Sequence, residues 1–600
     1  MHKQAVIFSS IFAFAFGVMA DRRELRVGVA GHAFDHLGNI GEQAEAAAAS
    51  GSTIIYATGF GSIGYNGLRT PEEMEQARKT ISAYNQRAKE NGIQLVLGYV
   101  CATSIVKLEI FDRNWSKKFR AQFSWPIAQW LQQDRNGTPL PSWYGGDYRP
   151  ACMNHPDWLN YEKFIVRQQI ESGHDGIFFD NPTVHPQGCY CEHCMKKFAK
   201  FLGDEGVEIH LPKTNALSFL RELAVKQSKD FMRFRCTTAR DFMGEIRLFA
   251  RTIKPDALIT CNNSLNSPGV FFSQCRDYGY NIYEMSKTED LVVAEDMANQ
   301  PRVLPNGSMV EYGHVYKLLH AISHEKPVVA VTIADGDYHT PPHLVRLAMA
   351  EAAANRASYL SWPTWPENQR AKMISTIRPQ SDFLRNNTKL LNDVQPRADV
   401  LLFLPFRKWT DAPNSWALDA AAALVRSNIQ FEAVCEDDFV QRLNSESAKK
   451  SILLLESSAD LNRREKEVLE KFQKKNGRIV FAGKGNWLFE IQNILKQPSI
   501  VLDAPPTVRA TVLDQKNKTI VHLFNLNIQK LSSFEDKISS ASNVRVKVRV
   551  PLTKVQSVEM LNADAGPSQQ LQFTPHREKN ESWVETTIPE LQISAMIVVK

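Results

Sequence analysis

Four cysteines are spaced as the ligands of a metal ion would be. Three of them lie within six residues, in GCYCEHCMKKF at residues 188–198, and the fourth lies upstream in YRPACMNHPDWLNY. A disulfide between neighbours in the first segment would close a small, strained ring, whereas four thiolates suit the tetrahedral coordination of Zn²⁺. The spacing leaves three possibilities open: a disulfide pair with spare thiols, no linkage, or a closed structural zinc site formed by Cys152, Cys189, Cys191 and Cys194.

Two short apolar segments, each typical of a β-strand, end in acidic residues. GIFFD ends in Asp180, which Asn181 follows, and LVVAED ends in Glu295 and Asp296. Glycoside hydrolysis needs two carboxyl groups, one to protonate the leaving oxygen and one to attack the anomeric carbon or activate water. Since neighbouring residues of a strand face opposite ways, at most one of the two adjacent acids can share a cavity with Asp180. We favour Glu295 and keep Asp296 as the alternative.

Eight short β-rich runs alternate with amphipathic helical segments over the first two thirds of the chain. The runs are continuously apolar, which is typical of strands that are covered on both faces, and several helical segments end in Gly or Pro. This pattern predicts a (β/α)8 barrel, with a doubly wound open sheet as the alternative. The predicted strands are 26–31, 52–58, 93–100, 176–180, 257–262, 291–296, 327–333 and 357–362.

Asp180 ends the fourth of these strands, and Glu295 lies at the end of the sixth. Barrel active sites gather at the C-terminal ends of the strands. The arrangement is similar to that of several retaining α-glycosidase groups with barrel folds, so we assign Asp180 as nucleophile and Glu295 as acid/base. Polar and aromatic side chains after the strands suit sugar hydroxyls and ring faces. The predicted substrate-binding residues are His32, Asp35, Tyr56, Asn181, Asn262, Asp335 and Trp362.

The pattern changes twice after the predicted barrel, which we assign to residues 21–390. Residues 391–500 alternate strands and helices, as in a Rossmann-like layer, but no Gly-rich phosphate loop follows a strand there. From residue 505 to 600 the helical period gives way to short alternating strands separated by polar turns, which predicts a small β-sandwich.

The first 20 residues, MHKQAVIFSSIFAFAFGVMA, combine a basic start, an apolar run and a small-residue cleavage pattern. This predicts a secretory signal peptide, with a membrane anchor as the alternative, and therefore an exported protein, periplasmic or extracellular. No later stretch predicts a membrane span. The formal net charge is only +6 over 600 residues and no long basic run occurs, so nucleic acid is not an expected partner.

The cysteine segments also carry a resemblance. ACMNHPDWLNY together with CYCEHCMKKFAKFLG resembles the zinc-bearing members of glycoside hydrolase family 42, the β-galactosidases, and is still more similar to hypothetical glycosyl hydrolase family 6. The resemblance implies structural zinc on the four cysteines. It also implies a barrel, then a Rossmann-like trimerisation domain and a β-sandwich, and hence a possible homo-oligomer. The family's catalytic glutamates do not carry over, because the fourth strand ends in Asp180-Asn181 and the seventh in VTIADG.

Together these observations predict an exported glycoside hydrolase that cleaves an oligo- or polysaccharide and needs no catalytic cofactor. The alternatives are a non-catalytic carbohydrate-binding protein on the same fold and a disulfide-stapled adhesion protein.

Overall fold

The computed structural model describes residues 27–30, 37–61, 70–113, 115, 117–124, 126–142, 145–264, 268–295, 302–324, 326–332, 341–361, 366–411, 416–564, 568–578 and 581–600. The chain packs as two compact units. One comprises residues 28–296 and 405–415, and the other comprises the remaining residues. Among the described residues, no helix has both the length and the apolar character that crossing a bilayer requires.

Eight parallel strands form a closed barrel, in the order β1-β10-β9-β8-β7-β6-β3-β2. Each strand falls on one of the predicted runs, so the predicted barrel is confirmed and the open sheet is wrong. Buried apolar runs account for this agreement, because the sheet is covered by side chains inside and helices outside. The strands are β1 (Val27–Ala30), β2 (Ile54–Gly61), β3 (Leu95–Cys101), β6 (Gly176–Asp180), β7 (Leu258–Ser264), β8 (Val292–Glu295), β9 (Val328–Thr332) and β10 (Ala357–Ser361).

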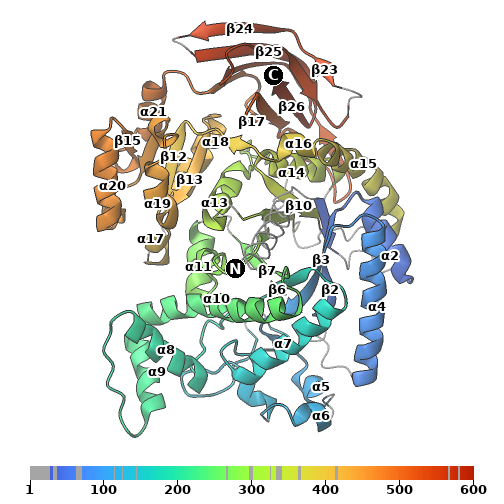
Figure 1. The fold of residues 1–600 in the computed structure, drawn as a ribbon, viewed down its shortest axis with the longest axis vertical. Coiled ribbons are helices and arrows are strands. Elements are labelled where there is room, and N and C mark those ends of the chain that lie inside the picture. Colours follow the sequence, from blue (N-terminus) through green and yellow to red (C-terminus); the bar gives the residue numbers. More distant parts are fainter. Residues whose placement is uncertain are drawn as a thin grey trace, which may run out of the picture. The chain divides into compact units, whose positions relative to one another are not determined.

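The unit that contains residues 28–296 carries three long helices, α4 (Pro71–Glu90), α7 (Pro156–Glu171) and α10 (Ser228–Ile253). Helices α7 and α10 pack side by side (Figure 1). The largest insertions follow the third and fourth barrel strands, as the sequence predicts. The first holds β4 (Ser104–Val106) and β5 (Tyr148–Pro150), and the second holds α8 (Glu192–Asp204) and α9 (Ala216–Lys226).

The other unit contains a parallel sheet of Rossmann type, in the order β13-β12-β14-β15. Its core joins strand residues to apolar residues of α19 (Glu436–Leu443) and α20 (Arg463–Lys474). The four strands are β12 (Val400–Leu404), β13 (Phe431–Cys435), β14 (Ile452–Leu455) and β15 (Arg478–Phe481).

Two antiparallel sheets follow and share one apolar core, which makes a β-sandwich. One has the order β11-β17-β18-β26-β22-β23, and the other β16-β21-β25-β24. The principal strands are β17 (Val508–Gln515), β18 (Lys518–Asn525), β21 (Ala541–Val550), β25 (Glu581–Leu591) and β26 (Ser594–Val599). The fold class predicted from the sequence is therefore confirmed, while the predicted domain boundaries stay a prediction.

Within this second unit, a buried carboxylate joins three distant parts of the chain. Glu311 is 1% exposed and accepts hydrogen bonds from Arg426 Nε and Arg509 Nε, each at 2.6 Å. Arg426 belongs to α18 (Trp416–Arg426), and Arg509 belongs to β17 of the sandwich. A buried acid of this kind needs its cationic partners, because an isolated buried charge is costly.

Buried histidines should make the protein sensitive to mild acid. Burial lowers the pKa of four of them far below the value of about 6.5 expected in an unfolded chain: to about 4 for His174, His314 and His522, and to about 3 for His320. As pH falls from about 6.5 toward 4, the unfolded chain takes up protons that the folded protein does not, so stability decreases over this window. Since one pKa unit corresponds to about 1.4 kcal/mol, we expect Tm to be clearly lower at pH 5 than at pH 7, measured by scanning calorimetry.

The matched control compares one buried and one exposed histidine. His522→Gln should weaken the pH dependence of Tm, whereas His210→Gln should leave it unchanged, because the His210 side chain is 88% exposed. Equal Tm values at pH 5 and pH 7 in the wild type would contradict the prediction.

Candidate functional site

Strand β6 alternates between the outside and the inside of the barrel. Phe179 packs edge-on against Phe242 of α10, with ring centroids 5.7 Å apart, so it faces the helical layer. Because side chains alternate along a strand, Phe178 and Asp180 face the interior. Phe178 accordingly meets the rings of Tyr56 at 4.6 Å and Tyr99 at 6.0 Å. The apolar run GIFFD thus places the Asp180 carboxylate at the C-terminal end of β6, on the side of the strand that faces the barrel interior.

Four hydrogen-bond donors converge on the Asp180 carboxylate. Tyr99 Oη donates to Oδ2 at 2.5 Å, and Asn181 Nδ2 donates to the same oxygen at 3.1 Å. The backbone N–H of Asn181 and Nδ2 of Asn262 donate to Oδ1 at 2.9 and 3.0 Å. Each of these four groups donates a hydrogen bond, and carboxylate oxygens are strong acceptors for such donors.

Asn262 connects Asp180 to a second acid. The same Nδ2 atom also donates to Glu295 Oε2 at 2.6 Å, so one amide nitrogen lies between two carboxylates from β6 and β8. The two acceptor oxygens can be no further apart than the sum of these two hydrogen-bond lengths. That sum is below the separation of about 6.5 Å at which the carboxyl groups of inverting glycosidases begin.

The backbone after Asp180 is fixed by its own contacts. Asn181 has a left-handed φ of 51°, a conformation that asparagine adopts more readily than most residues. Its carbonyl accepts a hydrogen bond from Thr103 Oγ1 at 2.6 Å, and the Asp180 carbonyl accepts one from the backbone N–H of Ala102 at 2.8 Å. These bonds hold the end of β6 against the end of β3 and so orient the carboxylate.

Two tyrosines belong to this site although the sequence analysis did not select them. Tyr99 donates to Asp180, and it lies on the inward-facing row of β3, so alternation along IQLVLGYV offers a signal for it. Tyr280 is 7% exposed. Burial above all raises its pKa, and the nearby Cys261 thiol and the carboxylates of Glu295 and Asp180 act in the same direction.

The structure brings together Asp180, Asn181, Asn262 and Glu295 of the predicted site residues. Tyr56 is 1% exposed and packs in the barrel interior against Phe178. The remaining predicted residues lie outside the described residues; they are His32, Asp35, Asp296, Asp335 and Trp362.

The four predicted metal ligands form one buried cluster. Their sulfur atoms all lie within 4.8 Å of one another, and each residue is at most 3% exposed. Cys152 Sγ lies 3.5 Å from Cys194 Sγ and 3.6 Å from Cys191 Sγ. These distances exceed the S–S bond length of about 2.05 Å, and all nine cysteines of the chain are free.

The cluster fits a tetrahedral metal ion. Zn–S bonds of about 2.3 Å place the sulfurs of a tetrahedron about 3.8 Å apart, close to the observed distances. Three N–H groups point at the sulfurs: Asn154 Nδ2 at Cys194 (3.3 Å), the Gln133 backbone at Cys189 (3.4 Å) and the Cys194 backbone at Cys191 (3.5 Å). Donors of this kind orient metal ligands and stabilise thiolate charge. The buried set of four thiols can therefore bind a metal ion.

The remaining cysteines are scattered along the sequence and lie outside the cluster. All of them are buried, as small apolar side chains commonly are; they are Cys101, Cys236, Cys261, Cys275 and Cys435.

Comparison with known proteins shows similarity in structure but not in sequence. No family model matches the chain, and no curated protein matches it. Among solved structures, α-L-fucosidase isoenzyme 2 from Paenibacillus thiaminolyticus is similar with a TM-score of 0.62 at 14% identity, over 96% of this chain and 99% of that one. A GH42 β-galactosidase from G. stearothermophilus has a TM-score of 0.63 at 10% identity, over 96% and 98% of the two chains.

A β-galactosidase from Bacillus circulans sp. alkalophilus is similar to the same degree, with a TM-score of 0.62 at 11% identity and coverage of 97% and 99%. At these identities the likeness concerns the fold. The chain therefore has the barrel-containing fold of these glycoside hydrolases, over nearly its whole length.

Proposed function

We propose that this protein is a glycoside hydrolase in which Asp180 is the nucleophile and Glu295 the acid/base. The observation that carries the proposal is the Asn262 amide, which holds both carboxylates at one end of the barrel strands. Glu295 contacts this amide at 2.6 Å, which supports its choice as the acid/base; Asp296 lies outside the described residues. The glycosidase fold of the structural neighbours supports the same reaction class.

In the proposed reaction, Asp180 attacks the anomeric carbon while Glu295 gives its proton to the departing glycosidic oxygen. The C–O bond to the leaving group breaks as the bond to Asp180 forms, which gives a glycosyl ester. Glu295, now ionised, takes a proton from water, and the resulting hydroxide displaces Asp180 from the sugar. Tyr99 and Asn181 orient the nucleophile through their hydrogen bonds to its oxygens.

The N-terminal segment has the pattern of an export signal. The substrate in this proposal is therefore a carbohydrate outside the cytoplasm. The four-cysteine cluster would hold structural zinc. A zinc ion with four protein ligands supplies cross-linking of the chain and no catalytic water. Cys189, Cys191 and Cys194 follow Asn181 by eight to thirteen residues, so the site would fix the loop that leaves the nucleophile. The trimerisation-like layer domain makes a homo-oligomer part of the same proposal.

The geometry predicts that the product keeps the anomeric configuration of the substrate. Two displacements at one carbon give net retention, and the bound set by the shared Asn262 amide on the distance between the two acceptor oxygens lies below the carboxyl separation of about 6.5–9.5 Å in inverting enzymes. The test is a screen of aryl α- and β-glycosides, including fucosides, galactosides and glucosides, followed by proton NMR of the first-formed product anomer on any substrate that turns over.

Each outcome of this screen is informative. Retention supports the assignment, and inversion would contradict the nucleophilic role of Asp180. Sugar binding without turnover of any substrate would favour the carbohydrate-binding alternative.

A further inference from the structure

A second group of side chains that can ligate a metal lies in the unit that contains the layer domain and the sandwich. Within the part of the chain that the structure describes, one group besides the four-cysteine cluster brings three such residues together, and it consists of His324, Cys435 and Asp438. One donor atom from each residue lies within 4.8 Å of the other two. The sequence gives no spacing signal for this group, because 114 positions separate His324 from Asp438.

Three elements bring these side chains together. His324 directly follows α13 (Gly313–Ser323) and has a left-handed φ of 50°, with which the helix ends. Cys435 is the last residue of β13, and Asp438 lies three residues further on, in the first turn of α19. Residues three apart at a helix lie on the same face. Since α13 packs against β13, the histidine meets the cysteine and the aspartate of the neighbouring segment.

The distances between the donor atoms suit a small divalent ion. His324 Nδ1 lies 3.0 Å from Asp438 Oδ2, and Cys435 Sγ lies 3.8 Å from the same oxygen. The bond lengths of Zn²⁺ place a nitrogen and an oxygen of one tetrahedron about 3.4 Å apart, and a sulfur and an oxygen about 3.6 Å apart. The His324 and Asp438 side chains are 25% and 44% exposed, so small rotations of these two suffice to close the differences.

The existing contacts of the three donors compete only weakly with a metal ion. An ion pair as exposed as the one between His324 and Asp438 contributes little to stability. The buried Cys435 thiol donates to the Ala321 carbonyl at 3.3 Å. On metal binding the thiol would release its proton to water, and the thiolate and the Asp438 carboxylate would then balance the two positive charges of the ion.

A further carboxylate stands next to the other ring nitrogen of the histidine. Asp437 Oδ2 lies 3.8 Å from His324 Nε2. If Nδ1 binds the metal, the proton of the ring is on Nε2, on the side of this carboxylate. Carboxylates in this position fix the tautomer and the orientation of metal-bound histidines.

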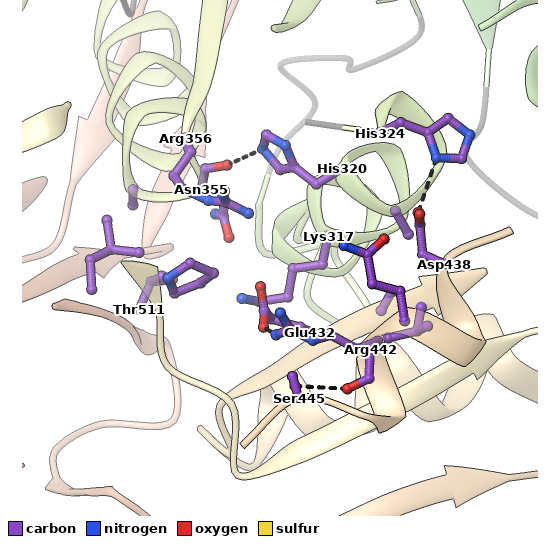
Figure 2. Close-up of a pocket in the computed structure, with 17 residues that line it drawn as sticks. Lys317, His320, His324, Asn355, Arg356, Glu432, Asp438, Arg442, Ser445 and Thr511 are labelled. Atoms are coloured by element: carbon purple, nitrogen blue, oxygen red, sulfur yellow. Dashed lines mark hydrogen bonds and ion pairs between the residues drawn. The ribbon is translucent and has the colours of Figure 1, made fainter. Parts of the chain in front are cut away.

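The group lies at the edge of a cavity of about 400 Å³. His324 and Asp438 are among the lining residues, and Figure 2 shows their side chains directed at one another. Other lining residues are Lys317 of α13 and Thr511 and Leu513 of β17. Three protein ligands leave a fourth position on a tetrahedral ion, which water or a donor atom of a small molecule in the cavity would fill.

We propose that His324, Cys435 and Asp438 bind one Zn²⁺ ion whose fourth coordination position is open to this cavity. Thiolate and imidazole ligands favour zinc over Mg²⁺ and Ca²⁺, which prefer oxygen ligands only. This site is separate from the closed four-cysteine cluster and does not depend on the proposed hydrolase chemistry. Because it has three protein ligands and is partly exposed, it should release its ion during purification unless zinc is supplied.

The test is isothermal titration calorimetry of the untagged full chain with Zn²⁺, with metal analysis by mass spectrometry after dialysis against buffered micromolar zinc. We expect the wild type to hold one zinc ion per chain more than His324→Gln and Cys435→Ser, whatever the four-cysteine cluster holds. Each of the two substitutions should weaken Zn²⁺ binding at this site at least tenfold. Cys152→Ser should leave this binding unchanged.

The matched control is Asp419→Asn, at an exposed acid in the first turn of α18, which should keep the affinity of the wild type. Co²⁺ in place of zinc should give a cobalt–thiolate absorption band that Cys435→Ser lacks, and Mg²⁺ should give no binding heat. Tm shows whether each variant is folded; should Cys435→Ser not fold, the partly exposed His324→Gln decides. Equal zinc content and affinity in the wild type and in His324→Gln would overturn the proposal.

Discussion

Asp180→Asn should abolish turnover, with kcat reduced by at least about 10³-fold, the scale on which loss of a covalent nucleophile acts. The amide has nearly the same shape as the carboxylate but cannot attack the anomeric carbon. The NH₂ group of the amide also cannot accept hydrogen bonds, whereas Tyr99, Asn181 and Asn262 all donate to Asp180 in the wild type. The measurement is kcat on the aryl glycoside that the wild type cleaves fastest, with Tm as the check that the variant is folded.

Three further variants make this result specific. Asp204→Asn changes an exposed acid whose partner is Lys200 and should keep full activity. Asp180→Gly with added azide should regain part of the turnover and form a glycosyl azide, because the anion replaces the missing nucleophile. Glu295→Gln should lose most activity on poor leaving groups but little on activated aryl groups, since only the former need a proton. Wild-type kcat in Asp180→Asn would rule out the proposed mechanism.

Loss of the cysteine cluster should be the largest stability effect in the molecule. We expect about one zinc ion per chain in the purified protein, and Cys152→Ser to lose most of it. The binding free energy of a structural zinc ion is folding free energy, about 10 kcal/mol or more in small zinc domains. Even part of that should lower Tm by roughly 10 °C, given about 2–4 °C per kcal/mol in domains of 150–250 residues. Metal analysis by mass spectrometry and differential scanning fluorimetry measure the two effects.

The control is a buried cysteine of the same unit that lies outside the cluster. Cys236 Sγ donates to the Cys275 carbonyl at 3.6 Å, so Cys236→Ser should keep the metal and lose little stability. A metal-chelating agent should reproduce the Tm decrease of Cys152→Ser in the wild type. A metal-free protein whose Tm the chelator does not change would contradict the prediction.

The barrel could be predicted from the sequence because its signals are local. Each strand is a short apolar run, and each helix shows its own period and stop signals. The acids could be selected for the same reason, since GIFFD and VVAE end in carboxylates and all parallel strands end on one side. The cysteine cluster was predictable because three of its four members lie within one short segment.

The contacts that complete the site could not be read from the sequence. Asn262 was expected to bind substrate, but in the structure its amide nitrogen lies between Asp180 and Glu295, and no residue pattern specifies such a bridge. Tyr99 is one aromatic residue among many until β3 is placed beside β6. The cavity lined by Lys317, Thr511 and Leu513 is formed by segments up to about two hundred residues apart, so only the tertiary fold brings its lining residues together.

The buried Glu311 has a consequence for any attempt to shorten the protein. Deleting the C-terminal sandwich would take away Arg509 and leave this acid with the largely exposed Arg426 as its remaining partner. The sandwich therefore contributes to the stability of the segment that contains Glu311. A shortened chain that ends after the layer domain should be insoluble or sensitive to proteases. Replacing Glu311 with a neutral residue at the same time should reduce this effect.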